Sequence, residues 1–460
     1  MNPAFDASRS EFASGWPTLV LALAGVATSV SALLIYSLGT LMVPLQQAMG
    51  WSRADLQIAV SFLAAGGALS INLVGWLNLS YGMRAVSAVS MLAVCLAFAA
   101  LTKIPGPSAA TATTLAAPGS IGWLYLGYFV LPFIGLGTTP VTWTHIVALR
   151  FMKHRGLALS LVLCGTGVSA ALLPSALTWA VARWGWQAGY LLLATLPLSL
   201  WLLMFAARAW RHLPTRGAEA AFAGTGAVGA VGAVGAASAV SAAATAARAG
   251  MPFGTALRDR RFWICNIALG LVVSAIYGLA TNTVPLLRDL GLSAAQAGAI
   301  FGAFGVALIV GRIGVGLLID RLWAPGVAAI ALALPAGGCL LLLGADASTP
   351  TAVLVLATAL IGVGSGAEFD IAAYLVSRYF GLRDYGRLFG LHLCVVTLGS
   401  TVAPFAFAAL LRASGGYALM LMVCAAFCVV GPLLLLTLGR YPPITATKSN
   451  PLPVNPATAS

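Results

Sequence analysis

Apolar residues recur along this 460-residue chain in long runs, separated by short segments rich in polar residues, glycine or proline. A helix needs ~20 mostly apolar residues to cross ~30 Å of hydrocarbon, because it rises ~1.5 Å per residue. Twelve runs reach this length, and we expect each to form one membrane-spanning helix. The expected spans are residues 17–42, 54–75, 84–103, 121–148, 156–181, 187–207, 262–286, 293–319, 325–344, 351–376, 386–411 and 416–438.

A repeat relates the first six of these runs to the last six. The segment that begins at Val43-Pro44-Leu45 recurs 241 residues later at Val284-Pro285-Leu286. The same offset relates Gly50, Ser52, Ala54 and Gly75 to Gly291, Ser293, Ala295 and Gly316. A second similarity, in a different register, matches residues 134–137 to residues 361–364. Two membrane-embedded halves in the same orientation are typical of a solute carrier.

The segment between the two halves differs from the spans in composition. Residues 217–250 contain no Leu or Ile and repeat the triplet Gly-Ala-Val, so they bring little favourable transfer energy into a bilayer. We interpret this segment as part of a flexible linker. The predicted organisation is an N-terminal tail (1–16), a six-helix half (17–208), a linker (209–261), a second six-helix half (262–438) and a C-terminal tail (439–460).

Composition and charge support a membrane protein and assign its orientation. The chain is 60% hydrophobic and 8% charged, whereas soluble domains carry about 25% charged residues. Placing both termini in the cytoplasm puts 18 of the 24 Lys and Arg residues on the inner side, as the positive-inside rule requires. The net charge of +13 therefore indicates a multi-pass protein of the inner membrane, with the lipid bilayer as partner and no nucleic acid.

Several kinds of chemistry are not indicated by the sequence. The seven cysteines fall inside expected spans and form no Cys-x-x-Cys pair or metal-binding spacing with histidine. No phosphate-binding Gly-x-x-x-x-Gly-Lys-Ser/Thr loop is present. We therefore expect no metal, no cofactor, no enzymatic activity and no use of ATP.

Three charged residues lie well inside expected spans, away from the span ends, where insertion of a charge costs at least ~2.5–3.5 kcal/mol. Arg312 is eight residues before Asp320, and Asp370 is eight residues before Arg378, so Arg312 and Asp370 are expected at one depth, ~12 Å from the inner rim. This common depth allows a direct ion pair between Arg312 and an acid of the 351–376 span. Glu368 and Asp370 are ~200° apart around their helix, so only one of them can face a central cavity.

The arrangement of spans and several motifs resemble the major facilitator superfamily. In that superfamily the loop after the second span carries Gly-x-x-x-Asp-Arg-x-Gly-Arg. Gly75 remains here, with Arg84 one residue beyond the final Arg of the pattern, while the second half keeps Gly316, Asp320 and Arg321. The resemblance implies that these five residues take part in gating. Further motifs resemble the monocarboxylate transporter and oxalate/formate antiporter branch: residues 50–55, 155–158, 185–190 and 378–381.

The same resemblance implies a binding site. The family's arginine on the eighth span, followed four residues later by glycine, binds a substrate carboxylate, and Arg312 with Gly316 matches that spacing. The acid that monocarboxylate transporters often place four residues before this arginine is replaced by Leu308, so Glu368 or Asp370 is expected to carry a coupled proton. Tyr36, Tyr277 and Asn282 fall on spans that line the cavity in this superfamily; each is a candidate for substrate binding or for an interhelical contact.

We therefore expect a secondary active transporter of a small organic anion, most simply a carboxylate coupled to protons. The alternatives are exchange of one anion for a counter-anion and efflux of an amphipathic compound. A structural alternative for Arg312 is an ion pair that only joins two helices. A monomer is expected.

Overall fold

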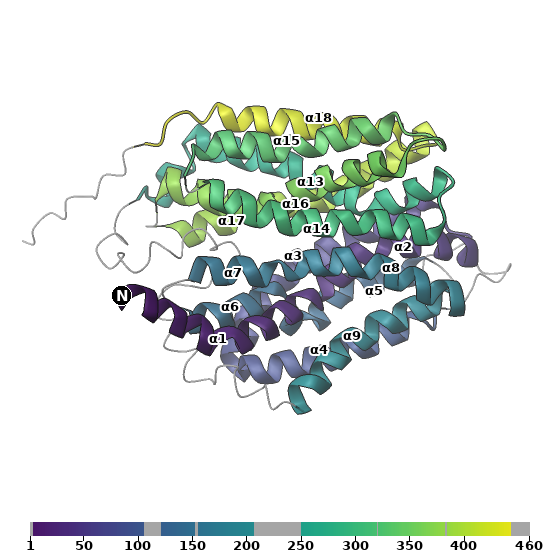
Figure 1. The fold of residues 1–460 in the computed structure, drawn as a ribbon, viewed down its shortest axis with the longest axis horizontal. Helices are drawn as coiled ribbons and strands as arrows, with labels where there is room; N and C mark the ends of the chain where they lie inside the picture. Colours follow the sequence, from purple (N-terminus) through teal and green to yellow (C-terminus); the bar gives the residue numbers. More distant parts are fainter. Residues whose placement is uncertain are drawn as a thin grey trace, which may run out of the picture.

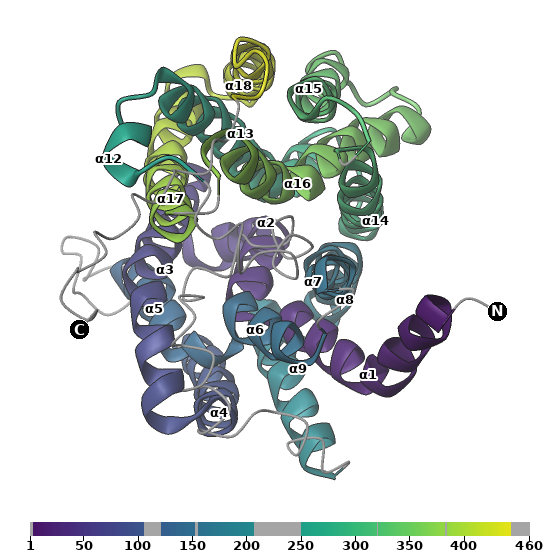
Figure 2. The same cartoon turned by 90° about the vertical axis from the view of Figure 1, so that its left-hand side faces the viewer.

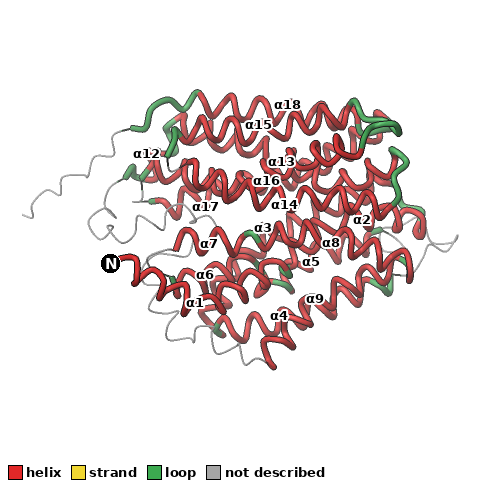
Figure 3. The backbone as a smooth tube through the Cα atoms, in the orientation of Figure 1, coloured by secondary structure: helices red, strands yellow, loops and turns green. Residues whose placement is uncertain are grey.

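The computed structural model describes residues 3–104, 121–151, 155–206, 250–319, 321–381 and 384–442. These residues form helices joined by turns, and the one β-bridge among them pairs Gly250 with Gly381. Figure 1 shows the helices in two groups, one from each half of the chain. The tube in Figure 3 shows how little of the described chain is non-helical.

The helices of the first group come from residues before 207. They are α1 (Pro3–Ala27), α2 (Val30–Met49), α3 (Arg53–Tyr81), α4 (Met83–Leu101), α5 (Gly122–Ile134), the short 3-10 helix η1 (Leu136–Thr138), α6 (Pro140–Arg150), α7 (Arg155–Leu163), α8 (Gly165–Trp184) and α9 (Trp186–Ala206).

The helices of the second group follow residue 250. They are α12 (Phe253–Ala256), α13 (Arg260–Asp289), α14 (Ala294–Ile319), α15 (Ala324–Leu343), α16 (Thr351–Phe380), α17 (Tyr385–Ser414) and α18 (Ala418–Leu436). Within the described residues, ten helices are long and apolar enough to cross a membrane. The helix α3 and the interrupted segment α5–η1–α6 occupy the two remaining expected spans. The predicted all-helical fold of two six-helix halves is thereby confirmed.

The predicted linker and tails lie largely outside the described residues. Of the linker, only the part from Gly250 onward is described, including α12 and the first turn of α13. The boundaries predicted for the five segments therefore stay predictions.

The two ends of the bundle can be distinguished by the chain termini. The start of α1 and the end of α18 lie at the same end (Figure 1), which we call the proximal end. The turns after α2, α8, α13 and α17 lie at the opposite end, which we call the distal end.

Three of the expected spans are interrupted rather than continuous. The first breaks between α1 and α2, the fourth at η1 and the fifth at Cys164. The first two breaks contact each other, because the backbone N–H of Val30 donates to the Thr138 hydroxyl at 3.2 Å. Gly135 lies against Val30, and a Cβ at Gly135 would be 2.6 Å from the Val30 side chain. A backbone donor freed by a helix break needs such a partner inside a membrane.

The sequence repeat has a structural counterpart at the distal end. Gly50 and Gly291 adopt φ of 70° and 90°, a region that favours glycine. Ser52 then accepts a hydrogen bond from the Asp55 N–H at the start of α3, and Ser293 accepts one from the Gln296 N–H at the start of α14. The repeated Gly-x-Ser pattern is thus a turn followed by a helix N-cap in both halves.

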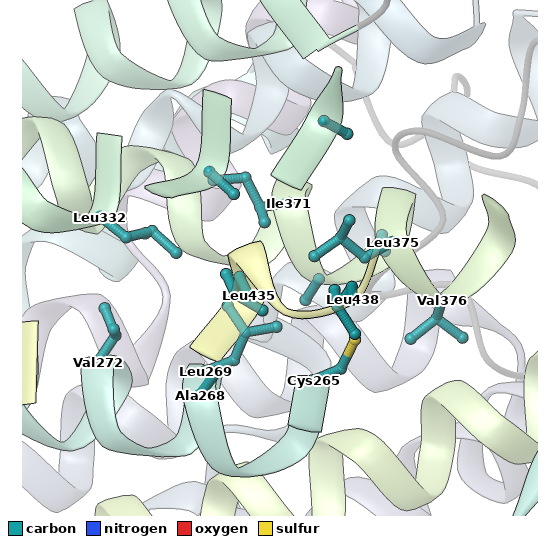
Figure 4. Packing of buried hydrophobic residues seen from close by; sticks show 14 of the residues in the cluster. Cys265, Ala268, Leu269, Val272, Leu332, Ile371, Leu375, Val376, Leu435 and Leu438 are labelled. Carbon is teal, nitrogen blue, oxygen red and sulfur yellow. The ribbon is translucent and has the colours of Figure 1, made fainter. Parts of the chain in front are cut away.

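Buried apolar side chains pack each half. Figure 4 shows Leu269, Ile371 and Leu435, from α13, α16 and α18, in one such cluster of the second half. Close helix contacts use glycine: a Cβ at Gly362 would lie 2.3 Å from the Phe304 carbonyl oxygen of α14. Between the halves, a Cβ at Gly305 of α14 would lie 2.5 Å from the Gly167 carbonyl oxygen of α8. Small residues let helix backbones approach this closely.

Candidate functional site

A cavity of about 190 Å³ lies between the two halves, and we call it the central cavity. Its walls come from α2, α6, α7 and α8 of the first half and from α13, α14 and α16 of the second. In Figure 2, which looks along the bundle, α2, α13, α14 and α16 lie where the two groups of helices meet. The first-half lining includes Ser31, Ala32 and Pro140, which follow the breaks in the first and fourth spans. Interrupted helices are typical of binding sites in transporters.

Arg312 lies in the wall of the central cavity, where only 5% of it is exposed to solvent. Its Nε has no hydrogen-bond partner within the described residues. Glycines press α14 and α16 together beside it: a Cβ at Gly366 would lie 2.1 Å from the Leu308 carbonyl oxygen and 2.9 Å from the Arg312 backbone nitrogen. The arginine is therefore held by close backbone packing, and its charge faces the space between the halves.

The structure distinguishes the two acids of α16. Glu368 lines the central cavity, whereas Asp370 is not among the lining residues. Both are buried, and Glu368 Oε2 and both carboxylate oxygens of Asp370 have no hydrogen-bond partner in the described part of the chain. Their separation around the helix explains why only one of them reaches the cavity.

Arg312 does not form the direct ion pair with an acid of α16 that the sequence allowed. The ion pairs of the described residues join other side chains, and Arg312 bonds neither to Glu368 nor to Asp370. Arg312 and Asp370 were expected at one depth, but the acid that shares the cavity with Arg312 is Glu368, and neither carboxylate contacts the guanidinium. The site therefore holds a guanidinium and a carboxyl that share a space without neutralising each other directly.

Tyr36 of α2 and Tyr277 of α13 line the same cavity from opposite halves. Within the described residues, neither phenolic hydroxyl makes a hydrogen bond to protein. The Tyr36 ring packs against Phe304 with centroids 6.0 Å apart. Arg312 and Glu368 therefore share the cavity with two phenols and apolar side chains, and with the hydroxyl residues Ser31, Thr166 and Ser365.

Asn282, the remaining predicted substrate contact, lies elsewhere. It is fully buried, and its side-chain amide donates to Gln57 of α3 at 2.9 Å and to the Gly278 carbonyl at 2.8 Å. Gln57 also donates to the Thr281 hydroxyl at 3.2 Å. The structure thus places Asn282 in a polar link between the halves, the interhelical alternative. Gln57 was not predicted as a polar contact, although it stands out as an amide within the apolar run 54–75.

Two ion pairs at the distal end also join the halves, and neither was predicted. Arg53 at the start of α3 binds both carboxylate oxygens of Asp289 at the end of α13, with 2.6 Å between Nη2 and Oδ1. Arg412 near the end of α17 binds Asp55 of α3. The sequence located these residues at span ends but offered no signal for their pairing across more than 230 positions.

The four predicted gating residues that the structure describes lie toward the proximal end. Gly75 lies within α3 and Arg84 in the first turn of α4. Gly316 lies in α14, where an added Cβ would meet no atom within 4 Å. Arg321 is exposed in the turn after α14, and Asp320 lies outside the described residues. Their role in gating stays a prediction.

Comparisons with known proteins agree with this architecture. The family model of the Major Facilitator Superfamily matches residues 24–356 and 285–459. Monocarboxylate transporter 13 of Bos taurus is 25% identical over 355 residues, covering 75% of this chain and 76% of that protein. A gallate transporter of Pseudomonas putida is 31% identical over 264 residues, covering 52% of this chain and 57% of its own length.

Solved structures show the same fold at low sequence identity. A D-xylose-proton symporter matches with a TM-score of 0.63 and 15% identity, covering 92% of this chain and 97% of that one. A proton:xylose symporter bound to 6-bromo-6-deoxy-D-glucose matches with a TM-score of 0.59 and 14% identity, covering 92% of this chain and 94% of that one. The family and these relatives are transporters rather than enzymes. With two repeated six-helix halves around a central cavity and a family model that matches nearly its whole length, the chain belongs to the Major Facilitator Superfamily.

Proposed function

We propose that this transporter moves a small organic anion with one carboxylate, by alternating access and with proton symport. The observation that carries the proposal is the buried guanidinium of Arg312 in the wall of a cavity between the two halves. The named relatives, a monocarboxylate transporter and a gallate transporter, support the same class of substrate.

The environment of Arg312 favours an anion as ligand. A charge removed from water is costly unless it is paired and hydrogen-bonded, and Arg312 makes no ion pair within the described residues. Its planar guanidinium can hold a carboxylate through two parallel hydrogen bonds. The cavity of about 190 Å³ is below the ~300–1,000 Å³ of drug-sized ligand pockets, so we expect a small substrate.

Glu368 is the proposed proton carrier because it shares the cavity with Arg312. When a carboxylate binds to Arg312, an ionised Glu368 adds a second negative charge to the same enclosed space. Like charges at close range oppose each other, so substrate binding and protonation of Glu368 favour one another. This mutual preference is what symport requires. Asp370, which is buried outside the cavity lining, is the alternative carrier.

Anion exchange is the second candidate, and the absence of a direct Arg312 pair in the described structure favours it. After the substrate leaves, the unpaired charge of Arg312 opposes the change of the empty transporter back to its starting conformation. Binding of a second anion pairs that charge and removes the opposition. In both mechanisms we propose a monomer in the inner membrane with both termini and the proximal end in the cytoplasm. The distal ion pairs then close the outer side.

The test is a thermal-stability screen of the purified protein against monocarboxylates and dicarboxylates at pH 5.5 and 7.5. A ligand at 100 times its Kd stabilises the folded state by ~2.7 kcal/mol. Loss of a charge-assisted hydrogen bond of ~1.5–3 kcal/mol predicts roughly 10- to 100-fold weaker binding in Arg312→Gln. Arg258→Gln, which removes an exposed arginine before α13, serves as the matched control. Carboxylates that stabilise Arg312→Gln as strongly as the wild type would refute the proposal.

A further inference from the structure

A second and larger cavity lies at the distal end, and we call it the distal cavity. It has a volume of about 450 Å³ and shares no lining residue with the central cavity. Its walls come from α2, α8 and the start of α9 in the first half, and from the end of α13 and the start of α14 in the second. Gln47 and Gly185 in its lining are exposed, so the cavity opens at the surface.

Two polar groups in this lining lack partners. Thr40 is 8% exposed, and its hydroxyl makes no hydrogen bond. Arg288 is half-buried and forms no ion pair or side-chain hydrogen bond within the described residues. By contrast, Arg53 and Arg412 at the same end are each paired with an acid of the other half. A buried hydroxyl and a cation without partners are groups that a ligand would satisfy.

The repeat gives the separation of these two groups. Arg288 corresponds to Gln47 under the 241-residue offset, and Gln47 lies seven residues beyond Thr40 on α2. Seven residues of helix rise ~10 Å. Most of the remaining lining is apolar and includes Val43, Val284 and Trp186. The Thr178 hydroxyl, also in the lining, already donates to the Pro174 carbonyl at 2.7 Å.

We propose that the distal cavity is a second ligand site, which binds an aromatic carboxylate carrying a hydrogen-bonding substituent. The carboxylate binds Arg288, the ring packs against Val43, Val284 and Trp186, and the substituent bonds to the Thr40 hydroxyl. No acidic residue occurs in the lining, so an anion meets no opposing charge there. The volume of about 450 Å³ lies within the ~300–1,000 Å³ typical of small-molecule pockets.

The position of this site gives it an inhibitory effect on transport. Thr40 and Val43 belong to the first half, whereas Val284 and Arg288 belong to the second, so a ligand here bridges the halves. The ion pairs tie α3 to α13 and α17, while the distal cavity lies beside α8 and α14. A bound ligand adds a tie on that side. If the halves separated at the distal end, the ligand would lose its contacts with one of them. Binding of the ligand therefore favours the distally closed state.

The experiment is a calorimetric titration of the purified full chain with 4-hydroxybenzoate. The Arg312→Gln variant removes the guanidinium of the central cavity, so any binding that it retains reports on the distal cavity. We expect retained binding that weakens at least tenfold when Arg288→Gln is added and severalfold when Thr40→Val is added. Arg183→Gln is the matched control, because Arg183 lies at the same end but outside the lining, with its guanidinium 4.9 Å from the Trp179 ring centroid.

The outcomes separate this proposal from the proposed function. If Arg312→Gln abolishes all binding, the distal site is refuted and the central site stands. If Arg288→Gln abolishes binding that Arg312→Gln leaves unchanged, the distal site stands and the central assignment fails. An Arg288-dependent signal given by phosphatidylglycerol and not by 4-hydroxybenzoate would overturn the proposal in favour of a lipid site. Absence of binding to every variant would refute it as well.

The conformational effect has its own readout. A cysteine introduced as Ala280→Cys lines the central cavity, and an impermeant thiol reagent on the distal side reaches it only when that end opens. In the Arg312→Gln background, saturating 4-hydroxybenzoate is expected to slow this labelling severalfold. Faster labelling would mean that the ligand wedges the halves apart, contrary to the bridging role.

Discussion

We predict that the Arg53–Asp289 ion pair helps to hold the two halves together at the distal end. Arg53 contributes both guanidinium Nη atoms to the two carboxylate oxygens of Asp289, and the two side chains are 28% and 42% exposed. The Arg412–Asp55 pair is more exposed, at 54% and 36%. Solvent screens such pairs, so a typical exposed pair contributes only ~0.2–1 kcal/mol, with bidentate geometry at the upper end.

Removal of the Arg53–Asp289 pair should therefore shift the balance toward the distally open state by ~0.5–1 kcal/mol. At ~1.4 kcal/mol per factor of ten, this corresponds to roughly a two- to fivefold larger open population. Loss of both pairs would shift the balance by ~0.7–2 kcal/mol, a factor of about 3–30. The direction follows from the pairs joining α3 of the first half to α13 and α17 of the second.

The assay is the labelling rate of Ala280→Cys by an impermeant thiol reagent applied to the distal side. The exposed native thiol of Cys394 is removed by Cys394→Ala in every variant. Labelling should accelerate in Arg53→Gln and Asp289→Asn, and the double variant should be no faster than either single one, because both remove the same interaction. High salt should accelerate labelling of the parent protein by screening.

The control and the refuting results are equally specific. Arg183→Gln removes a positive charge from the same end without breaking a cross-half pair, and it should leave the rate unchanged. If Arg53→Gln behaves like Arg183→Gln, or if the effects of Arg53→Gln and Asp289→Asn are additive, the pair does not hold the distal end closed.

Two further predictions concern coupling and packing. Glu368→Gln should abolish proton-driven accumulation of substrate in proteoliposomes, because the amide cannot carry a proton. Anion exchange should persist, because Arg312 is still in place. Unchanged accumulation would mean that Asp370 carries the proton. Gly366→Ala should lower the free energy of unfolding by ~1–3 kcal/mol, because its Cβ would lie 2.1 Å from the Leu308 carbonyl oxygen. Gly316→Ala, on the facing helix α14, is the control: its Cβ would meet no atom within 4 Å, and the substitution should be neutral. Equal effects of the two substitutions on the melting temperature would contradict the packing argument.

The sequence predicted the fold well because hydrophobic length alone selects membrane spans. All twelve expected spans are occupied by helices. The breaks were missed for a tertiary reason: the freed N–H of Val30 is satisfied by Thr138, 108 residues away. No local pattern marks such a contact.

The candidate site was predicted in part. Depth along the helix predicted Arg312 and Asp370 at one level, whereas the acid that lines the cavity with Arg312 is Glu368, two residues earlier on α16. The absence of a direct pair depends on side-chain placement that depth does not determine. Asn282 was assigned from its helix alone, and its actual partner Gln57 lies 225 residues away in the other half. Long-range polar links of this kind require the three-dimensional structure.

The distribution of polar contacts suggests how a small ligand can drive the cycle. The cross-half bonds of Arg53, Asp55, Gln57 and Asn282 all lie between the central cavity and the distal end, while Arg312 and Glu368 make no ion pair within the described residues. The two distal ion pairs together contribute only ~0.7–2 kcal/mol. A ligand that gains a charge-assisted contact of ~1.5–3 kcal/mol in one state alone can outweigh them. Under the proposed function, weak distal ion pairs are therefore a requirement of transport, because stronger ones would exceed the free energy that binding of a small anion supplies.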